Sequence, residues 1–108
     1  MILYGITTCD TCKKAQKALI SAGHAVTFRD VRAEPLNEAE WAELLQEFGD
    51  RLVNRNSTTW RGLNDWMKSA EAVAQLARHP TLMQRPVLRD GAKMTLGWDA
   101  KAEAAWGL

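Results

Sequence analysis

The chain has 108 residues, of which 46% are hydrophobic and 25% charged, and these values are ordinary for a soluble globular domain. Its net charge is +1, from 14 basic and 13 acidic residues, which argues against nucleic-acid binding driven by bulk electrostatics, since no large basic excess displaces counterions. No apolar stretch has the length of a membrane span, and no signal-peptide core follows Met1. We therefore expect a cytoplasmic protein with no membrane segment, in a compartment that keeps thiols reduced.

The first third of the chain predicts a strand, a helix and a second strand. The apolar run 2–6 predicts the first strand, and apolar residues at helical spacing between residues 15 and 22 predict a helix that ends near Gly23. The β-branched and aromatic segment 25–31 predicts the second strand. A strand, a helix and a strand within about 30 residues indicate a βαβ unit, whose crossover is expected to be right-handed.

The middle of the chain predicts a helical insert over about residues 37–79. Asn37, with Glu40 three residues later, resembles a capping box that begins a helix, and Gly49 ends it. Ser69 is expected to cap a further helix that ends at His79-Pro80. The apolar residues at helical spacing in the insert are Trp41, Leu44, Leu45 and Phe48, then Trp60, Leu63 and Trp66, then Val73, Leu76 and Ala77.

The last third predicts a hairpin and a short helix. Segments 86–89 and 92–96 have strand character, and Asp90-Gly91 between them suits a tight type I′ turn. Asp99 is expected to cap a terminal helix. The order is therefore βαβ, a helical insert and ββα, and the absence of a repeat or linker favours one domain over residues 1–108. The tryptophans expected to pack in the core or in an interface are Trp41, Trp66, Trp98 and Trp106.

The only two cysteines, Cys9 and Cys12, lie between the first strand and the first helix. At a helix N-terminus the unpaired N–H groups and the positive end of the dipole stabilise a thiolate, and a second cysteine three residues later lies one turn away. The pattern is compatible with thiol exchange, redox sensing or zinc binding. Zinc would need two further ligands, and His24 and His79 have no zinc-like spacing, so we expect no metal site.

Five segments that extend in order over nearly the whole chain carry a resemblance to a known family. They are Leu3-Tyr4-Gly5-Ile6, Cys9-Asp10-Thr11 with Lys13-Lys14-Ala15, Thr58-Thr59-Trp60-Arg61 with Leu63, Arg85-Pro86-Val87-Leu88, and Leu96-Gly97. Together they resemble the ArsC family of thioredoxin-like proteins. That family includes glutathione-coupled arsenate reductases, the Spx transcriptional regulators and the small YffB-like proteins, and the chain is most similar to the YffB-like and Spx-like branch.

The resemblance implies an α/β fold of the thioredoxin-like type, in which the βαβ unit, the helical insert and the ββα unit surround a mixed four-stranded sheet. It implies that Cys9 is the catalytic nucleophile and that Cys12 either resolves an intermediate or closes a redox switch. It also implies that Arg85 is a catalytic residue that stabilises negative charge, and that Pro86 is cis, faces Cys9 and contacts the substrate.

The arsenate reductases place two further arginines around the oxyanion. On an ungapped comparison these positions fall at Asn54 and Leu96, so the three-arginine clamp is incomplete and arsenate is not the expected substrate. Arg55 and Arg61 lie close to the first of the two positions. They are the predicted additional substrate-binding residues, although the polar loop around them can equally be a capped entry into a helix.

Two functions of different classes follow from the resemblance. The first is a cytoplasmic thiol-dependent reductase, expected to be monomeric, with glutathione as co-substrate, no bound cofactor, and a small thiol or oxyanion substrate. The alternative is an Spx-like redox-sensing regulator, in which a Cys9–Cys12 disulfide changes the affinity for an RNA polymerase subunit. A third possibility is a domain whose site is vestigial, because the arginine clamp is partial.

Overall fold

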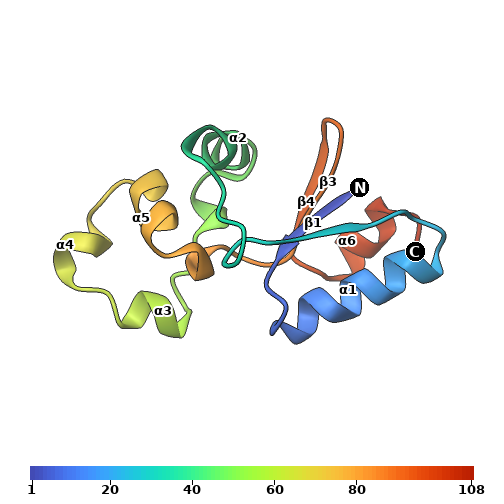
Figure 1. The fold of residues 1–108 in the computed structure, drawn as a ribbon, viewed down its shortest axis with the longest axis horizontal. Helices are drawn as coiled ribbons and strands as arrows, with labels where there is room; N and C mark the ends of the chain where they lie inside the picture. Colours follow the sequence, from blue (N-terminus) through green and yellow to red (C-terminus); the bar gives the residue numbers. More distant parts are fainter. The chain divides into compact units, whose positions relative to one another are not determined.

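The computed structural model describes residues 1–108 and contains one sheet of four short strands (Figure 1). The strands are β1 (Ile2–Gly5), β2 (Thr27–Asp30), β3 (Val87–Asp90) and β4 (Lys93–Leu96), in the order β2-β1-β3-β4. β1 runs parallel to β2 and antiparallel to β3, and β3 is antiparallel to β4. The predicted mixed four-stranded sheet and its element order are confirmed.

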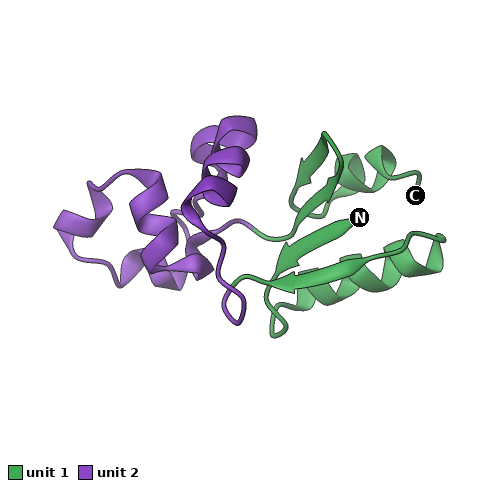
Figure 2. Ribbon diagram, turned by 45° about the horizontal axis from the view of Figure 1, so that its top comes forward, with its two compact units in different colours: residues 1–31, 85–108 green, residues 32–84 purple.

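The chain divides into two units (Figure 2). Unit 1 comprises residues 1–31 and 85–108 and holds the sheet together with helices α1 (Asp10–Ser21) and α6 (Ala100–Ala105). Unit 2 comprises residues 32–84 and is helical. The predicted insert lies within unit 2. No helix combines the length and the apolar character that crossing a lipid bilayer demands.

The core of unit 1 fills the space between the sheet and helices α1 and α6. Leu3 lies directly opposite Leu88 in the β1–β3 ladder, so both side chains point to the same face of the sheet. Helix α1 covers this face with its apolar stripe, and Trp106 closes it from the end of α6. Full burial of one leucine side chain contributes about 2 kcal/mol. The buried cluster is Leu3, Cys12, Ala15, Leu19, Leu88 and Trp106, so the first turn of α1 is held by the core itself.

The C-terminal helix is anchored by the indole of Trp106. Its Nε1–H donates to Thr95 Oγ1 on β4 at 2.8 Å, and the ammonium of Lys93 lies 4.4 Å from the ring centroid. The Trp106 carbonyl is 2.9 Å from His24 Nε2, and the two rings meet edge to face. At the other end, Asp99 Oδ1 accepts from the Ala102 N–H at 2.8 Å, so the predicted N-cap is confirmed.

The hairpin turn differs from the prediction. Asp90 pairs with Lys93, so the two-residue loop is Gly91-Ala92 and not Asp90-Gly91. Gly91 has φ of 61°, whereas no residue other than glycine has a positive φ. A type I′ turn needs positive φ at both central residues, which an alanine resists, whereas type II′ needs it only at the first. The φ signs therefore fit a type II′ turn.

Unit 2 begins with α2 (Glu38–Phe48), whose predicted capping box is present. Asn37 Oδ1 accepts from the Glu40 N–H at 2.8 Å, and Glu40 Oε1 accepts from the Asn37 N–H at 3.0 Å. Trp41 is fully buried, as predicted. Short 3₁₀ helices η1 (Gly49–Leu52) and η2 (Pro80–Leu82) complete the unit.

The middle of unit 2 is more broken than the apolar spacing predicted. Trp60 and Trp66 lie on separate helices, α3 (Thr58–Arg61) and α4 (Asp65–Lys68), because Asn64 caps a new helix with its side chain on the Met67 N–H. Ser69 does not cap α5 (Ala72–Arg78). Its hydroxyl donates to the carbonyls that end α4. Trp66 is 72% exposed and therefore lies outside the core. The apolar spacing that predicted its burial does not continue past the new helix start at Asn64.

Candidate active site

Cys9 is the residue that begins helix α1. Its backbone is extended, at φ −85° and ψ 114°, and its Sγ accepts the Cys12 N–H at 3.4 Å. The sulfur thus takes the place of the oxygen that usually caps a helix, and it satisfies one of the N–H groups that the first turn leaves unpaired. The chain reaches this position through a turn in which the Cys9 N–H donates to the Ile6 carbonyl at 3.1 Å.

The surroundings of Cys9 favour its thiolate. Burial by itself raises the pKa of this thiol, but hydrogen bonds from the Cys12 side chain and N–H, and the hydrogen bond and charge of Arg85, outweigh it. The net effect is a Cys9 pKa below its ordinary value. Lys13, Lys14 and Lys17 are exposed on α1, where solvent screens their charge. The cation that acts on the sulfur is Arg85.

Cys12 has the opposite character. It is fully buried in the core of unit 1, and burial, followed by the hydrogen bond and the charge of Cys9, raises its pKa to about 12. Both cysteines are free thiols. The pair therefore consists of a half-buried thiol with a lowered pKa at the helix end and a buried thiol with a raised pKa one turn later.

The Arg85–Pro86 peptide bond is cis, as the resemblance implied. Pro86 is buried, and its carbonyl accepts the Gly97 N–H at 2.8 Å, which fixes the entry into β3 against the end of β4. Arg85 is thereby carried on a fixed segment next to the start of α1. The structure thus brings together Cys9, Cys12 and Arg85, three of the residues that the sequence singled out.

A buried carboxylate, which no sequence pattern indicates, holds the loop that leads to Cys9. Asp30, at the end of β2, is 9% exposed and accepts the Thr7 N–H on Oδ2 at 2.9 Å. The Val31 N–H donates to the Gly5 carbonyl at 2.9 Å in the same region. No three His, Cys, Asp or Glu side chains gather into a group that could hold a metal ion.

The other predicted substrate-binding residues belong to unit 2. The Arg55 guanidinium lies over the Trp60 ring, 5.4 Å from its centroid, and 4.0 Å from Asp50 Oδ1. Arg61 donates to the Asn56 carbonyl at 3.1 Å. Both arginines therefore have partners within their own unit, and their part in substrate binding stays a prediction.

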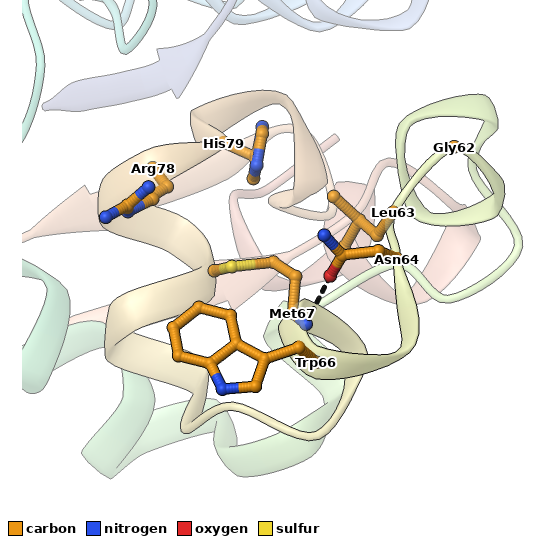
Figure 3. A pocket seen from close by; sticks show the side chains of 7 residues that line it. All are labelled: Gly62, Leu63, Asn64, Trp66, Met67, Arg78 and His79. Carbon is orange, nitrogen blue, oxygen red and sulfur yellow. Dashed lines mark hydrogen bonds between the residues drawn. The ribbon is translucent and has the colours of Figure 1, made fainter.

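Unit 2 contains a hollow of its own, with a volume of about 250 Å³ (Figure 3). Trp66, Met67 and Leu63 contribute apolar side chains to its lining, and Arg78 and His79 at the end of α5 contribute polar ones. No acidic side chain lines it. Tryptophan and arginine are the residues most enriched at the centres of protein–protein interfaces.

The ArsC family model matches residues 4–105, which include the whole of the site. The chain belongs to the ArsC family. The solved structure of a YffB protein superposes with a TM-score of 0.86 at 32% identity over 96% of both chains. An arsenate reductase (ArsC) related protein from Brucella melitensis gives a TM-score of 0.75 at 33% identity, over 99% of this chain and 94% of that one.

A curated relative comes from a different functional class. The global transcriptional regulator Spx of Listeria innocua is 25% identical over 103 residues, covering 90% of this chain and 79% of its own. The resemblance to the YffB-like and Spx-like members of the family is therefore confirmed. The similar proteins thus include both an arsenate reductase related protein and a transcriptional regulator.

Proposed function

We propose that this chain is a cytoplasmic thiol-dependent reductase, with Cys9 as its nucleophile and glutathione as the reductant. The observation that carries the proposal is the environment of Cys9, whose sulfur caps α1 at 3.4 Å from the Cys12 N–H while Arg85 bonds to it. A thiolate is the nucleophilic form of cysteine, and a helix terminus with an arginine is a setting that lowers its pKa. The solved ArsC-related structures support the assignment to a reductase family.

The proposed reaction has two exchange steps. The Cys9 thiolate attacks the electrophilic sulfur of a small substrate, a new S–S bond forms, and the substrate's own S–S bond breaks as its thiolate leaves with the electron pair. A glutathione thiolate then attacks the substrate-derived sulfur, which releases Cys9 as a thiolate. Arg85 stabilises the negative charge on Cys9 at the beginning and at the end of the cycle.

Arsenate is the less favoured substrate of this site. The positions of the two further arginines of the arsenate reductases hold Asn54 and Leu96, and an aliphatic side chain has no donor for an oxyanion. Leu96 ends β4 and pairs with Val87, so it is part of the sheet. A sulfur electrophile needs only the thiolate and one cation, which Cys9 and Arg85 provide.

The test is a turnover assay on the purified, reduced protein. The substrates are the mixed disulfide of cysteine and glutathione and, separately, arsenate, with glutathione as the reductant. We expect Cys9→Ser to abolish turnover and Cys12→Ser only to slow it or to change the preferred reductant. A Cys9→Ser protein with unchanged activity would rule out the mechanism.

A second candidate function is a redox-sensing regulator, in which a Cys9–Cys12 disulfide alters binding to an RNA polymerase subunit. The observation that favours it is the exposed Trp66 beside Arg78 and His79, a surface of the kind that binds protein partners, together with the Spx relative. The matching experiment measures binding of purified RNA polymerase to the oxidised and the reduced protein. Binding of the oxidised form only, lost in Trp66→Ala, with no turnover in the reductase assay, would make this the better assignment.

A further inference from the structure

Gly5, the last residue of β1, lies against the sulfur of Cys12. Five glycines of the chain have a positive φ, but Gly5 is not among them, so its backbone conformation does not require glycine. Space does. A Cβ at this position would lie 2.6 Å from Cys12 Sγ, and 3.2 Å from both Cys12 Cβ and Leu3 Cδ2. The Cys12 thiol therefore occupies the volume in which any other side chain would begin.

The position of this sulfur determines which hydrogen bonds Cys9 receives. Cys12 supplies both a backbone N–H, at 3.4 Å from Cys9 Sγ, and a side-chain hydrogen bond to the same atom. The backbone N–H belongs to the helix and does not depend on what lies under Cys12. The thiol is different, because it is fully buried and its sulfur lies where a Cβ at Gly5 would approach to 2.6 Å.

We propose that Gly5 is a positioning residue, whose missing side chain leaves the space that seats the Cys12 thiol as the hydrogen-bond donor to the Cys9 thiolate. The inference rests on the proposed function only in taking Cys9 as the nucleophile. Gly5 contacts neither the substrate nor Cys9, and its effect on Cys9 passes through the Cys12 thiol.

The seat also assigns Cys12 a role. Burial, followed by the hydrogen bond and charge of Cys9, raises the pKa of the Cys12 thiol to about 12, so in the reduced protein this thiol keeps its proton and can donate it to the Cys9 sulfur.

The experiment follows the rate of Cys9 alkylation by iodoacetamide against pH in the parent protein and in four variants. They are Gly5→Ala, Cys12→Ala, the double variant, and Gly62→Ala as the matched control. Gly62 has an ordinary φ, and a Cβ there would meet only carbonyl oxygens at 3.6 and 3.7 Å, so the same chemical change fits without displacement. Cys12→Ala removes the sulfur from the 2.6 Å contact and leaves only the contacts at 3.2 Å.

We expect Gly5→Ala to slow Cys9 alkylation below neutral pH by about tenfold, since a hydrogen bond to a charged group is lost. Cys12→Ala should slow it equally, the double variant should be no slower than Cys12→Ala alone, and Gly62→Ala should match the parent. If Gly5→Ala does not fold but the double variant does, the result supports the claim that Gly5 leaves space for the Cys12 sulfur. If neither variant folds, the result contradicts that claim.

A parent-like alkylation profile in Gly5→Ala, or additive effects of the two changes, would overturn the inference. Alkylation measures ionisation and not turnover, so it separates this inference from the proposed function. If the alkylation profiles follow the expectation but neither the parent nor any variant reduces a disulfide, the reductase assignment fails and the positioning role of Gly5 is still supported.

Discussion

Raising the pH above 9 should destabilise the reduced protein specifically through Cys12. The unfolded chain exposes this thiol, which then ionises near its ordinary value of 9.0, whereas the folded protein keeps it protonated up to about pH 12. Between these values the unfolded state binds fewer protons, so the free energy of unfolding falls by about 1.4 kcal/mol for each pH unit. From about pH 9 to about pH 10.5, Cys12 should therefore remove roughly 2 kcal/mol.

Cys9 works in the opposite direction and in a different pH range. Its folded pKa is lowered, so its contribution to stability grows as the pH rises through the folded value and is complete above the unfolded one. From about one pH unit above the unfolded value of 9.0, that contribution is constant. All other titratable side chains are common to the parent and Cys12→Ala, so the comparison of the two proteins isolates the effect of the Cys12 thiol.

The assay is urea unfolding of the parent and of Cys12→Ala under reducing conditions, at several pH values from 7 to 10.5. The cavity left by Cys12→Ala lowers its stability by a similar amount at every pH, so only the slopes are compared. The parent should lose roughly 2 kcal/mol more than the variant over the alkaline range. Equal slopes in the two proteins would show that the Cys12 thiol ionises in the folded state as it does in the unfolded chain, and the reasoning would fail.

Two further predictions concern residues around the site and the core. Arg85→Gln should raise the Cys9 pKa and slow its alkylation below neutral pH, with Arg85→Lys between the variant and the parent, because a lysine keeps the charge but not the planar donor group; an unchanged pH profile would contradict this. Trp106→Phe should lose the 2.8 Å bond to Thr95 and weaken the contact with Lys93, at a cost of about 1–2 kcal/mol in urea unfolding. An unchanged unfolding midpoint would argue against the anchoring of α6 by this indole.

Local signals in the sequence predicted much of the fold. Asn37 with Glu40 predicted a capping box, and Asp99 predicted a helix start, because both depend on residues three positions apart. The βαβ order and the hairpin followed from apolar periodicity of the same short range. Cys9 was identified for the same reason, since a cysteine between a strand and a helix is expected at the helix N-terminus.

The predictions that were wrong depended on tertiary contacts and on strand-pairing register, which local sequence patterns do not contain. The apolar spacing of Trp60 and Trp66 predicted one segment, but Asn64 begins a new helix between them. The turn at Gly91 was assigned one residue early, because the sequence does not specify which residues of two strands pair. Gly5 gave no signal of its contact with Cys12, which arises only when β1 and α1 pack together.

The proposed role of Cys9 depends most directly on the ionisation of its thiol. The rate of Cys9 alkylation by iodoacetamide, followed against pH, measures this ionisation. Cys9→Ser serves as the blank, because the buried Cys12 then remains as the only thiol. We expect a single titration of Cys9 with a midpoint below its ordinary value of 9.0. A midpoint at or above 9.0 would contradict the claim that Arg85, Cys12 and the start of α1 prepare Cys9 as a nucleophile.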